Sequence, residues 1–248
     1  MKQAADAFAH GDHRTALTGY EEACRINPDS AEAWCNRAGA SFVLGQRAEA
    51  ANFYQRALAI APPLVEARLG LVRIALTTSH LEEARMLLKA LPADLPARAV
   101  AESLYLQGIL AEHDQDPSAA ERLYQASVQA GHAPAHKALQ RLLLQMDKPR
   151  ELARLVSCEP NSGTPRRPAP ELTLHLLQHL PSARSRWLFF CTGADYLPDC
   201  AEWYECAAGV FLRQKEFAYA ARTAARARTA LGEDVVARWP ELRSCSWS

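Results

Sequence analysis

Long uninterrupted apolar runs are missing from this sequence. A membrane-spanning helix needs a run of about 18 or more apolar residues, and none occurs in the 248 residues. The first residues, Met-Lys-Gln-Ala-Ala-Asp-Ala-Phe, also lack the apolar core of a secretory signal peptide. We therefore expect no membrane insertion and a cytoplasmic location.

The sequence also lacks an excess of charge of either sign. Lys and Arg total 28, and Asp and Glu also total 28, so the formal net charge is zero at neutral pH. Proteins that bind nucleic acid rely on a positive field that attracts the phosphate backbone. We therefore expect no nucleic-acid partner for this chain.

The cysteines do not form the pattern of a common metal or redox site. They are Cys24, Cys35, Cys158, Cys191, Cys200, Cys206 and Cys245. Their number is odd and no Cys-x-x-Cys pair occurs, which predicts reduced thiols. Cys200 and Cys206 are separated by five residues, which matches no usual zinc or redox motif. We expect these two thiols to be buried.

The histidines give no complete ligand set either. His175 and His179 lie four residues apart, as do His132 and His136. Neither pair contains the Glu of a His-Glu-x-x-His zinc motif, and no third ligand is near in the sequence. We expect surface or interface histidines, and neither a metal ion nor another cofactor.

Glycine and β-branched residues are also comparatively sparse, whereas alanine is abundant and about half of the residues are apolar. Alanine is the best helix former, and β-branched residues favour strands. This composition predicts an all-α protein.

A stretch that does recur is residues 31–64. An early Trp34 opens one apolar period, Gly45 ends it, and a second period stops at Pro62, which predicts a helix, a tight turn and a second helix. The same residue types recur 34 positions earlier. The matched pairs are Gly11 and Gly45, Ala16 and Ala50, Tyr20 and Tyr54, Ala23 and Ala57, Ile26 and Ile60, and Pro28 and Pro62. A 34-residue period of this kind resembles the tetratricopeptide repeat family.

This resemblance implies an all-α fold, a right-handed superhelical solenoid of antiparallel helix pairs, with about five clear and two degenerate repeats. The clear repeats are expected at residues 2–28, 31–62, from 65 to the Pro92 joint, 101–132 and 199–231, and the degenerate ones at 135–157 and 171–193. Residues 120–139 also resemble a Sel1-like repeat, a close relative of the same design.

A proline-rich segment is expected to divide the chain. Residues 158–170 hold four prolines and one glycine, which favours a loop or hinge over a packed element. Residues 1–157 would then form an N-terminal array of TPR/Sel1-like repeats. Residues 171–248 would form a C-terminal helical region that ends in a capping tail. The apolar face of that cap would comprise Val235, Val236, Trp239 and Leu242.

The family resemblance further implies that the first helix of each repeat lines a concave groove. The candidate groove residues are Cys35, Phe42, Val43, Leu69, Arg73, Leu76, Tyr105, Ile109 and His113. The alternative for Phe42, Leu76 and Ile109 is that they pack only between repeats. Some related domains hold acidic chaperone tails with a clamp of Lys and Asn, but only Asn36 fits that pattern here.

We expect a noncatalytic scaffold or adaptor whose groove binds a segment of a protein or peptide partner. A narrower alternative is an accessory chaperone for secretion or envelope assembly. A different class would be an enzyme or metal-binding protein that uses residues in 171–206, although no nucleophile, phosphate loop or metal motif supports it. The last repeat also carries a basic face, which either meets an acidic partner or is solvated and balanced by nearby acids. Its basic residues are Arg213, Lys215, Arg222, Arg226 and Arg228. No residue pattern points to a partner's identity or to an oligomeric state.

Overall fold

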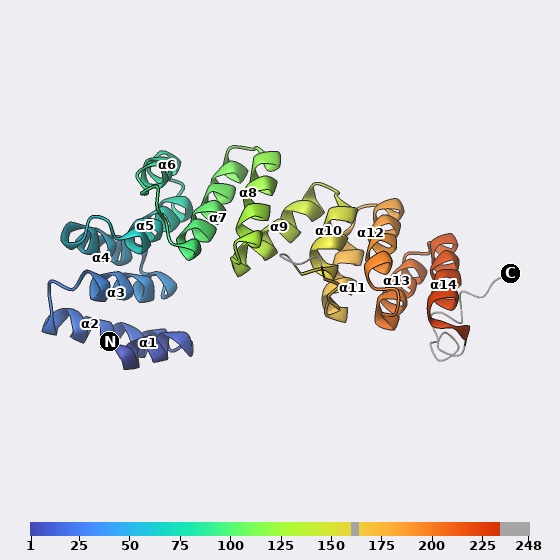
Figure 1. The fold of residues 1–248 in the computed structure, drawn as a ribbon, viewed down its shortest axis with the longest axis horizontal. Helices are drawn as coiled ribbons and strands as arrows, with labels where there is room; N and C mark the ends of the chain where they lie inside the picture. The colour runs from blue at the N-terminus through green and yellow to red at the C-terminus, as the bar shows by residue number, and fades with distance from the viewer. Residues whose placement is uncertain (160–163, 234–248) are drawn as a thin grey trace. The chain divides into compact units, whose positions relative to one another are not determined.

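The computed structural model describes residues 1–159 and 164–233, which form two compact units, residues 1–132 and residues 133–248. The first unit contains α1 (Lys2–Ala9), α2 (His13–Ile26), α3 (Ala31–Val43), α4 (Arg47–Ile60), α5 (Val65–Thr77), α6 (Leu81–Lys89), α7 (Ala97–His113) and α8 (Pro117–Gln129). The second contains α9 (Ala133–Gln145), α10 (Pro149–Ser157), α11 (Pro170–His179), α12 (Ala183–Tyr196), α13 (Ala201–Arg213) and α14 (Phe217–Leu231). Figure 1 shows these helices following one another as antiparallel neighbours in the first unit. The predicted all-α helical-repeat solenoid is confirmed for the described residues, while its handedness stays a prediction.

Helix starts follow the local sequence signals. Asp12, Ser30 and Asp116 each accept a hydrogen bond from the backbone N–H three residues later, which satisfies a donor that the helix itself leaves free. Pro117 and Pro149 each open a helix, where the missing N–H is harmless. Both prolines are thus local sequence signals for the helix starts that the structure shows.

The turn inside a repeat has one geometry in six of the helix pairs. In each of them one residue adopts a positive φ, and the N–H of the next residue donates to the carbonyl five residues earlier. The positive-φ residues are Gly11, Gly45, Ser79, Gln115, Asp147 and Lys215. Gly11 and Gly45 adopt this φ without strain, whereas a residue with a Cβ pays a steric cost there. The 34-residue spacing of Gly11 and Gly45 therefore reflects a turn that is repeated along the chain. Other residues occupy the same position in other repeats, so the turn does not require glycine.

Tyrosines on second helices pack against glycines on first helices in the first unit. Tyr54 is 2% exposed, and a Cβ atom on Gly70 would lie 2.3 Å from its ring. A Cβ atom on Gly108 would lie 2.5 Å from the ring of Tyr124. The helices can approach this closely because glycine has no side chain. Aromatic rings thus pack against small residues where these helices cross.

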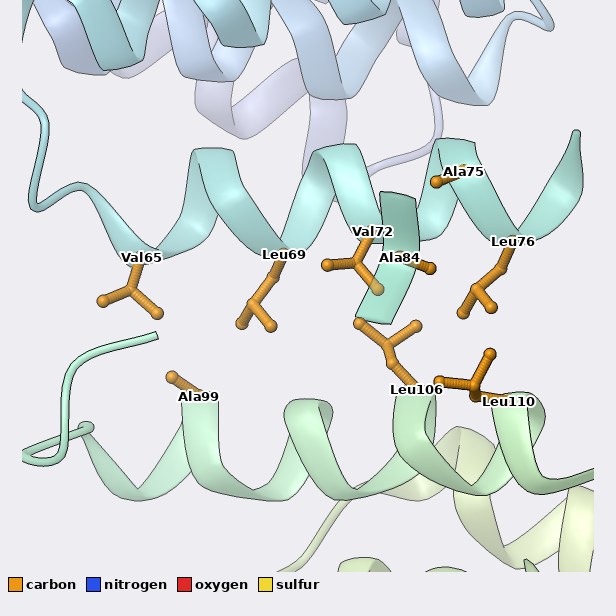
Figure 2. Packing of buried hydrophobic residues seen from close by; sticks show 9 residues of the cluster. All are labelled: Val65, Leu69, Val72, Ala75, Leu76, Ala84, Ala99, Leu106 and Leu110. Carbon is orange, nitrogen blue, oxygen red and sulfur yellow. The ribbon is translucent and has the colours of Figure 1, made fainter. Parts of the chain in front are cut away.

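The hydrophobic core between the third and fourth repeats lies between α5 and α7. Figure 2 shows side chains of α5 directed toward α7, with Leu106 and Leu110 on the facing helix and Ala84 contributed by α6. Leu69 is 1% exposed, and burying a leucine stabilises a fold by about 1.5–3 kcal/mol. Leu76 belongs to this core as well, which fits the alternative that it packs between repeats.

The second unit pairs its helices differently. α10 and α12 pack closely, and α11 packs against α13, so the helices of the predicted degenerate repeat 171–193 each have a main neighbour outside their own pair. The unit is rich in buried aromatic rings. Trp203 stacks on Phe189 at 5.2 Å and donates a hydrogen bond of 3.0 Å to the carbonyl of Phe190. A buried ion pair joins Arg186 to Glu216.

The ends of the proline-rich segment are hydrogen-bonded. Glu159 donates through its N–H to the carbonyl of Thr164, and Arg166 donates to the carbonyl of Ser157 at 2.7 Å. The division expected at residues 158–170 stays a prediction, and α10, which precedes this segment, contacts α12, the second helix after it. The predicted capping residues from Val235 onward lie outside the described residues, as does Cys245.

Candidate partner-binding groove

A cavity of about 340 Å³ lies on the first helices of the first unit. It receives residues from α1, α3, α5 and α7, together with one tyrosine from each of α2 and α4. The lining residues are Phe8, Tyr20, Cys35, Asn36, Gly39, Val43, Tyr54, Glu66, Leu69, Arg73, Pro96, Arg98, Ala99 and Glu102. We call this cavity the groove. It spans four consecutive repeats, and first helices supply twelve of these lining positions, counting Pro96 at the start of α7.

Gly39 makes room for the groove. It lies 34 residues before Arg73, so the two occupy equivalent positions on α3 and α5. A Cβ atom on Gly39 would lie 3.7 Å from the Tyr54 hydroxyl, with no closer neighbour outside its own helix. Because Gly39 has no side chain, the space above this hydroxyl stays open.

Arg73 lies at the centre of the groove's polar contacts. Its guanidinium donates to the Tyr54 hydroxyl at 3.4 Å and forms an ion pair of 3.4 Å with Glu102. The same group lies 5.5 Å from the centre of the Phe42 ring, which is a cation–π distance. Its Nε is buried and makes no hydrogen bond. Arg73 therefore joins α5 to three other helices, α3, α4 and α7.

Burial favours the protonated, neutral form of two groups in the groove lining, Cys35 and Tyr54. It raises the pKa of the Cys35 thiol to about 12, and it raises the pKa of Tyr54 to about 12. Both groups are consequently neutral at physiological pH. Cys35 lacks the thiolate that nucleophilic chemistry requires.

The structure brings four of the nine predicted groove residues into the cavity lining, and these are Cys35, Val43, Leu69 and Arg73. The other five lie elsewhere. Phe42 is half-buried against the α3–α5 core, and Tyr105 and Ile109 pack against the α5–α7 core that contains Leu76. His113 is exposed near the end of α7. Whether any of the nine contacts a partner stays a prediction.

Sequence reasoning missed the polar residues at the start of the first helices. Glu66 lies three residues before Leu69, and Glu102 lies three residues before Tyr105. Residues three apart share a helix face, so this spacing could have identified both glutamates. Pro96, Arg98 and Ala99 had no such signal, because the irregular joint after α6 shifts the start of α7.

The histidine pair of the second unit has local partners. His175 and His179 have ring centres 4.1 Å apart, and the His179 ring contacts the carbonyl of His175 at 2.8 Å. Cys200 is buried, and Cys206 is half-buried, with its Sγ 3.8 Å from the Pro170 carbonyl. Within residues 1–159 and 164–233, no group of three His, Cys, Asp or Glu side chains is placed to hold a metal ion.

The basic face of the last repeat is partly neutralised. Arg226 forms an ion pair with Asp195, and Arg228 forms one of 3.5 Å with Glu233. Arg222 lies over the ring of Tyr219, with 5.8 Å to its centre. These contacts favour a balanced surface over a site for an acidic partner.

Comparisons with known proteins agree with this helical-repeat architecture. A Pseudomonas aeruginosa pilF structure is 16% identical, has a TM-score of 0.50, and aligns over 92% of this chain and 88% of that one. A chain of the APC/C hetero-tetramer Cut9-Hcn1 is 11% identical, has a TM-score of 0.55, and aligns over 98% of this chain and 48% of that one. At these identities the likeness concerns the fold alone. No curated protein matches the chain.

The fold and the groove place the chain in the class of all-α repeat solenoids, which generally serve protein–protein interaction. The family model described as tetratricopeptide repeat matches residues 44–108. Residues 44–108 thus match tetratricopeptide repeats, and the resemblance drawn from the 34-residue period is confirmed. Among the described residues, no helix combines the length and the apolar character that crossing a membrane would need.

Proposed function

We propose that the chain is a noncatalytic scaffold that binds a segment of a partner protein in the groove of residues 1–132. The observation that carries this proposal is the cavity of about 340 Å³ built from the first helices of four consecutive repeats. A concave site on rigid helices is preformed, so a partner loses little affinity to reorganisation of the scaffold.

The chemistry of the groove supports binding over catalysis. Its walls combine apolar side chains such as Val43 and Leu69 with a few polar groups around Arg73, which is a common composition of ligand sites. Its one thiol, Cys35, is held neutral by a pKa of about 12. An adaptor function needs only such a surface. The chaperone role and the cytoplasmic location stay predictions.

The test compares two exposed apolar residues on different faces. Val43 lines the groove and is 50% exposed, whereas Met86 lies on the second helix α6 and is 73% exposed. Val43→Asp places a charge in the groove, and Met86→Asp is its matched control. Each variant is used as bait for affinity purification from the native cell, with mass spectrometry of the captured proteins and circular dichroism of the bait.

We expect Val43→Asp to lose the partners that the wild-type chain captures, while Met86→Asp keeps them and both variants stay helical. Capture that survives Val43→Asp but not Met86→Asp would place the partner on the second helices and contradict the proposal. Val43 is a sharper probe than Phe42, because Phe42 also packs against the core and its truncation would cost stability.

A further inference from the structure

Three glutamates occupy one equivalent position on successive first helices. Glu66 follows Glu32 by 34 residues, and Glu32 and Glu102 each precede the buried tyrosine of their own repeat by 22 residues. Equivalent positions of stacked repeats lie next to one another. The three carboxylates therefore follow each other from α3 to α5 to α7, and Glu66 and Glu102 line the groove itself.

One of these carboxylates is already neutralised. Glu102 forms an ion pair of 3.4 Å with Arg73. Among residues 1–159 and 164–233, neither Glu32 nor Glu66 forms an ion pair, and both are exposed. Within the described residues, Glu66 thus keeps an unpaired negative charge in the groove lining, and Glu32 keeps another on α3, outside that lining.

The charges of these glutamates reach the floor of the groove. After burial, Glu66 is the largest cause of the raised pKa of Cys35, and Glu32 and Glu102 raise this pKa further, while Arg73 opposes them. All three carboxylates therefore act on one lining atom. A cation beside Cys35 would lie in the field that they share.

Helix α7 contributes a positive charge to the groove. Arg98 lines it from the first turn of α7 and, within the described residues, forms no ion pair. Leu69 on α5 and Ala99 on α7 add apolar surface to the lining. The groove therefore combines these apolar side chains with the negative charge of Glu66 and the positive charge of Arg98.

We propose, as an extension of the scaffold function above, that the groove takes an extended partner segment in which a lysine or arginine beside Glu66 and Glu32 alternates with apolar side chains. Charge complementarity fixes this choice of occupant. The apolar side chains of the segment would lie on Val43 and Leu69. Its cationic side chain would neutralise the charges of Glu66 and Glu32, as Arg73 already neutralises Glu102.

The probes are three fluorescent pools of short synthetic peptides with the same apolar residues. The first pool carries Lys and Arg, the second carries Asp and Glu, and the third carries Gln and Ser. Binding to the full-length chain is followed by fluorescence anisotropy at low and at high salt. We expect the cationic pool to bind about tenfold more tightly than the acidic pool, with an advantage that shrinks as salt screens the charges.

Two charge reversals on facing sides of the groove provide matched variants. Glu66→Lys should weaken binding of the cationic pool by about tenfold, because it turns attraction into repulsion. Arg98→Glu should strengthen that binding, because it replaces a positive charge of the groove lining with a negative one. Both residues are exposed, so neither change should alter helicity in circular dichroism.

The outcomes separate this inference from the scaffold function. If all pools bind equally, or the acidic pool binds best, and Val43→Asp abolishes that binding, then the groove is the site and the cationic occupant is wrong. If no pool binds, or if Val43→Asp has no effect on binding, then the scaffold function and the inference both fail. Weakened cationic binding in Arg98→Glu would also overturn the charge assignment.

Discussion

The two units solve helix packing in different ways. In residues 1–132, Tyr54 and Tyr124 on second helices each pack against a glycine of a first helix. In the second unit, large rings fill the space between helices, and a buried ion pair joins Arg186 to Glu216. Regular packing by small residues leaves the faces of the first helices equivalent and free to form a groove. In the second unit, aromatic rings bury the comparable helix faces in the core.

The two units differ in where the cavity and the large buried rings lie. The cavity lies entirely within residues 8–102, where the period is best preserved. Trp203 on α13 lies against the preceding helix α12, and a Cβ atom on Gly193 would lie 1.8 Å from its ring. Large buried rings of this kind supply stability, whereas the first unit holds the proposed binding groove.

The largest expected effect is that of Trp203→Ala on the second unit. Removing this fully buried ring leaves a cavity and loses the hydrogen bond to the Phe190 carbonyl, so we expect a loss of about 3–5 kcal/mol in the free energy of unfolding. Hydrogen–deuterium exchange with mass spectrometry should show faster exchange in α12, α13 and α14. Equal acceleration in α3 to α5 would show that the units are not separate in stability.

A comparable change in the first unit is Tyr54→Ala. It removes the ring that packs on Gly70 and should cost about 3–5 kcal/mol in chemical denaturation. Tyr54→Phe is the control, because it keeps the ring and loses only the 3.4 Å contact with Arg73, worth about 1 kcal/mol. If Tyr54→Ala costs no more than Tyr54→Phe, the tyrosine–glycine packing is not the basis of the repeat.

The sequence predicted the helix pairs because their signals are local. Proline and cap residues mark helix starts, and the 34-residue period fixes which residues share a crossing. The pairing of α10 with α12 was not predictable in this way, since it depends on which large side chains fit together after the period fades. The groove was predicted in part: Cys35 and Leu69 follow from the period, but Arg98 and Ala99 depend on where the irregular joint starts α7.

The smallest expected effect concerns the turns that the two units share. Gln115 adopts a φ of 58°, a conformation that costs a residue with a Cβ about 1–2 kcal/mol. Gln115→Gly relieves that strain but increases the entropy of the unfolded chain, so we expect a net stabilisation of about 0.5–1 kcal/mol. The same change at Gln107, in the middle of α7, should instead destabilise by about 1 kcal/mol. Thermal denaturation of the two variants measures whether each change stabilises or destabilises the folded chain.

The central claim is that partners bind the first-helix groove of residues 1–132, and site-specific photocrosslinking tests it most directly. A benzophenone amino acid is placed at Val43 in one variant and at Met86 in another, and each is irradiated in the native cell. We expect a crosslinked partner from position 43 and none from position 86. A partner crosslinked from position 86 alone would contradict it.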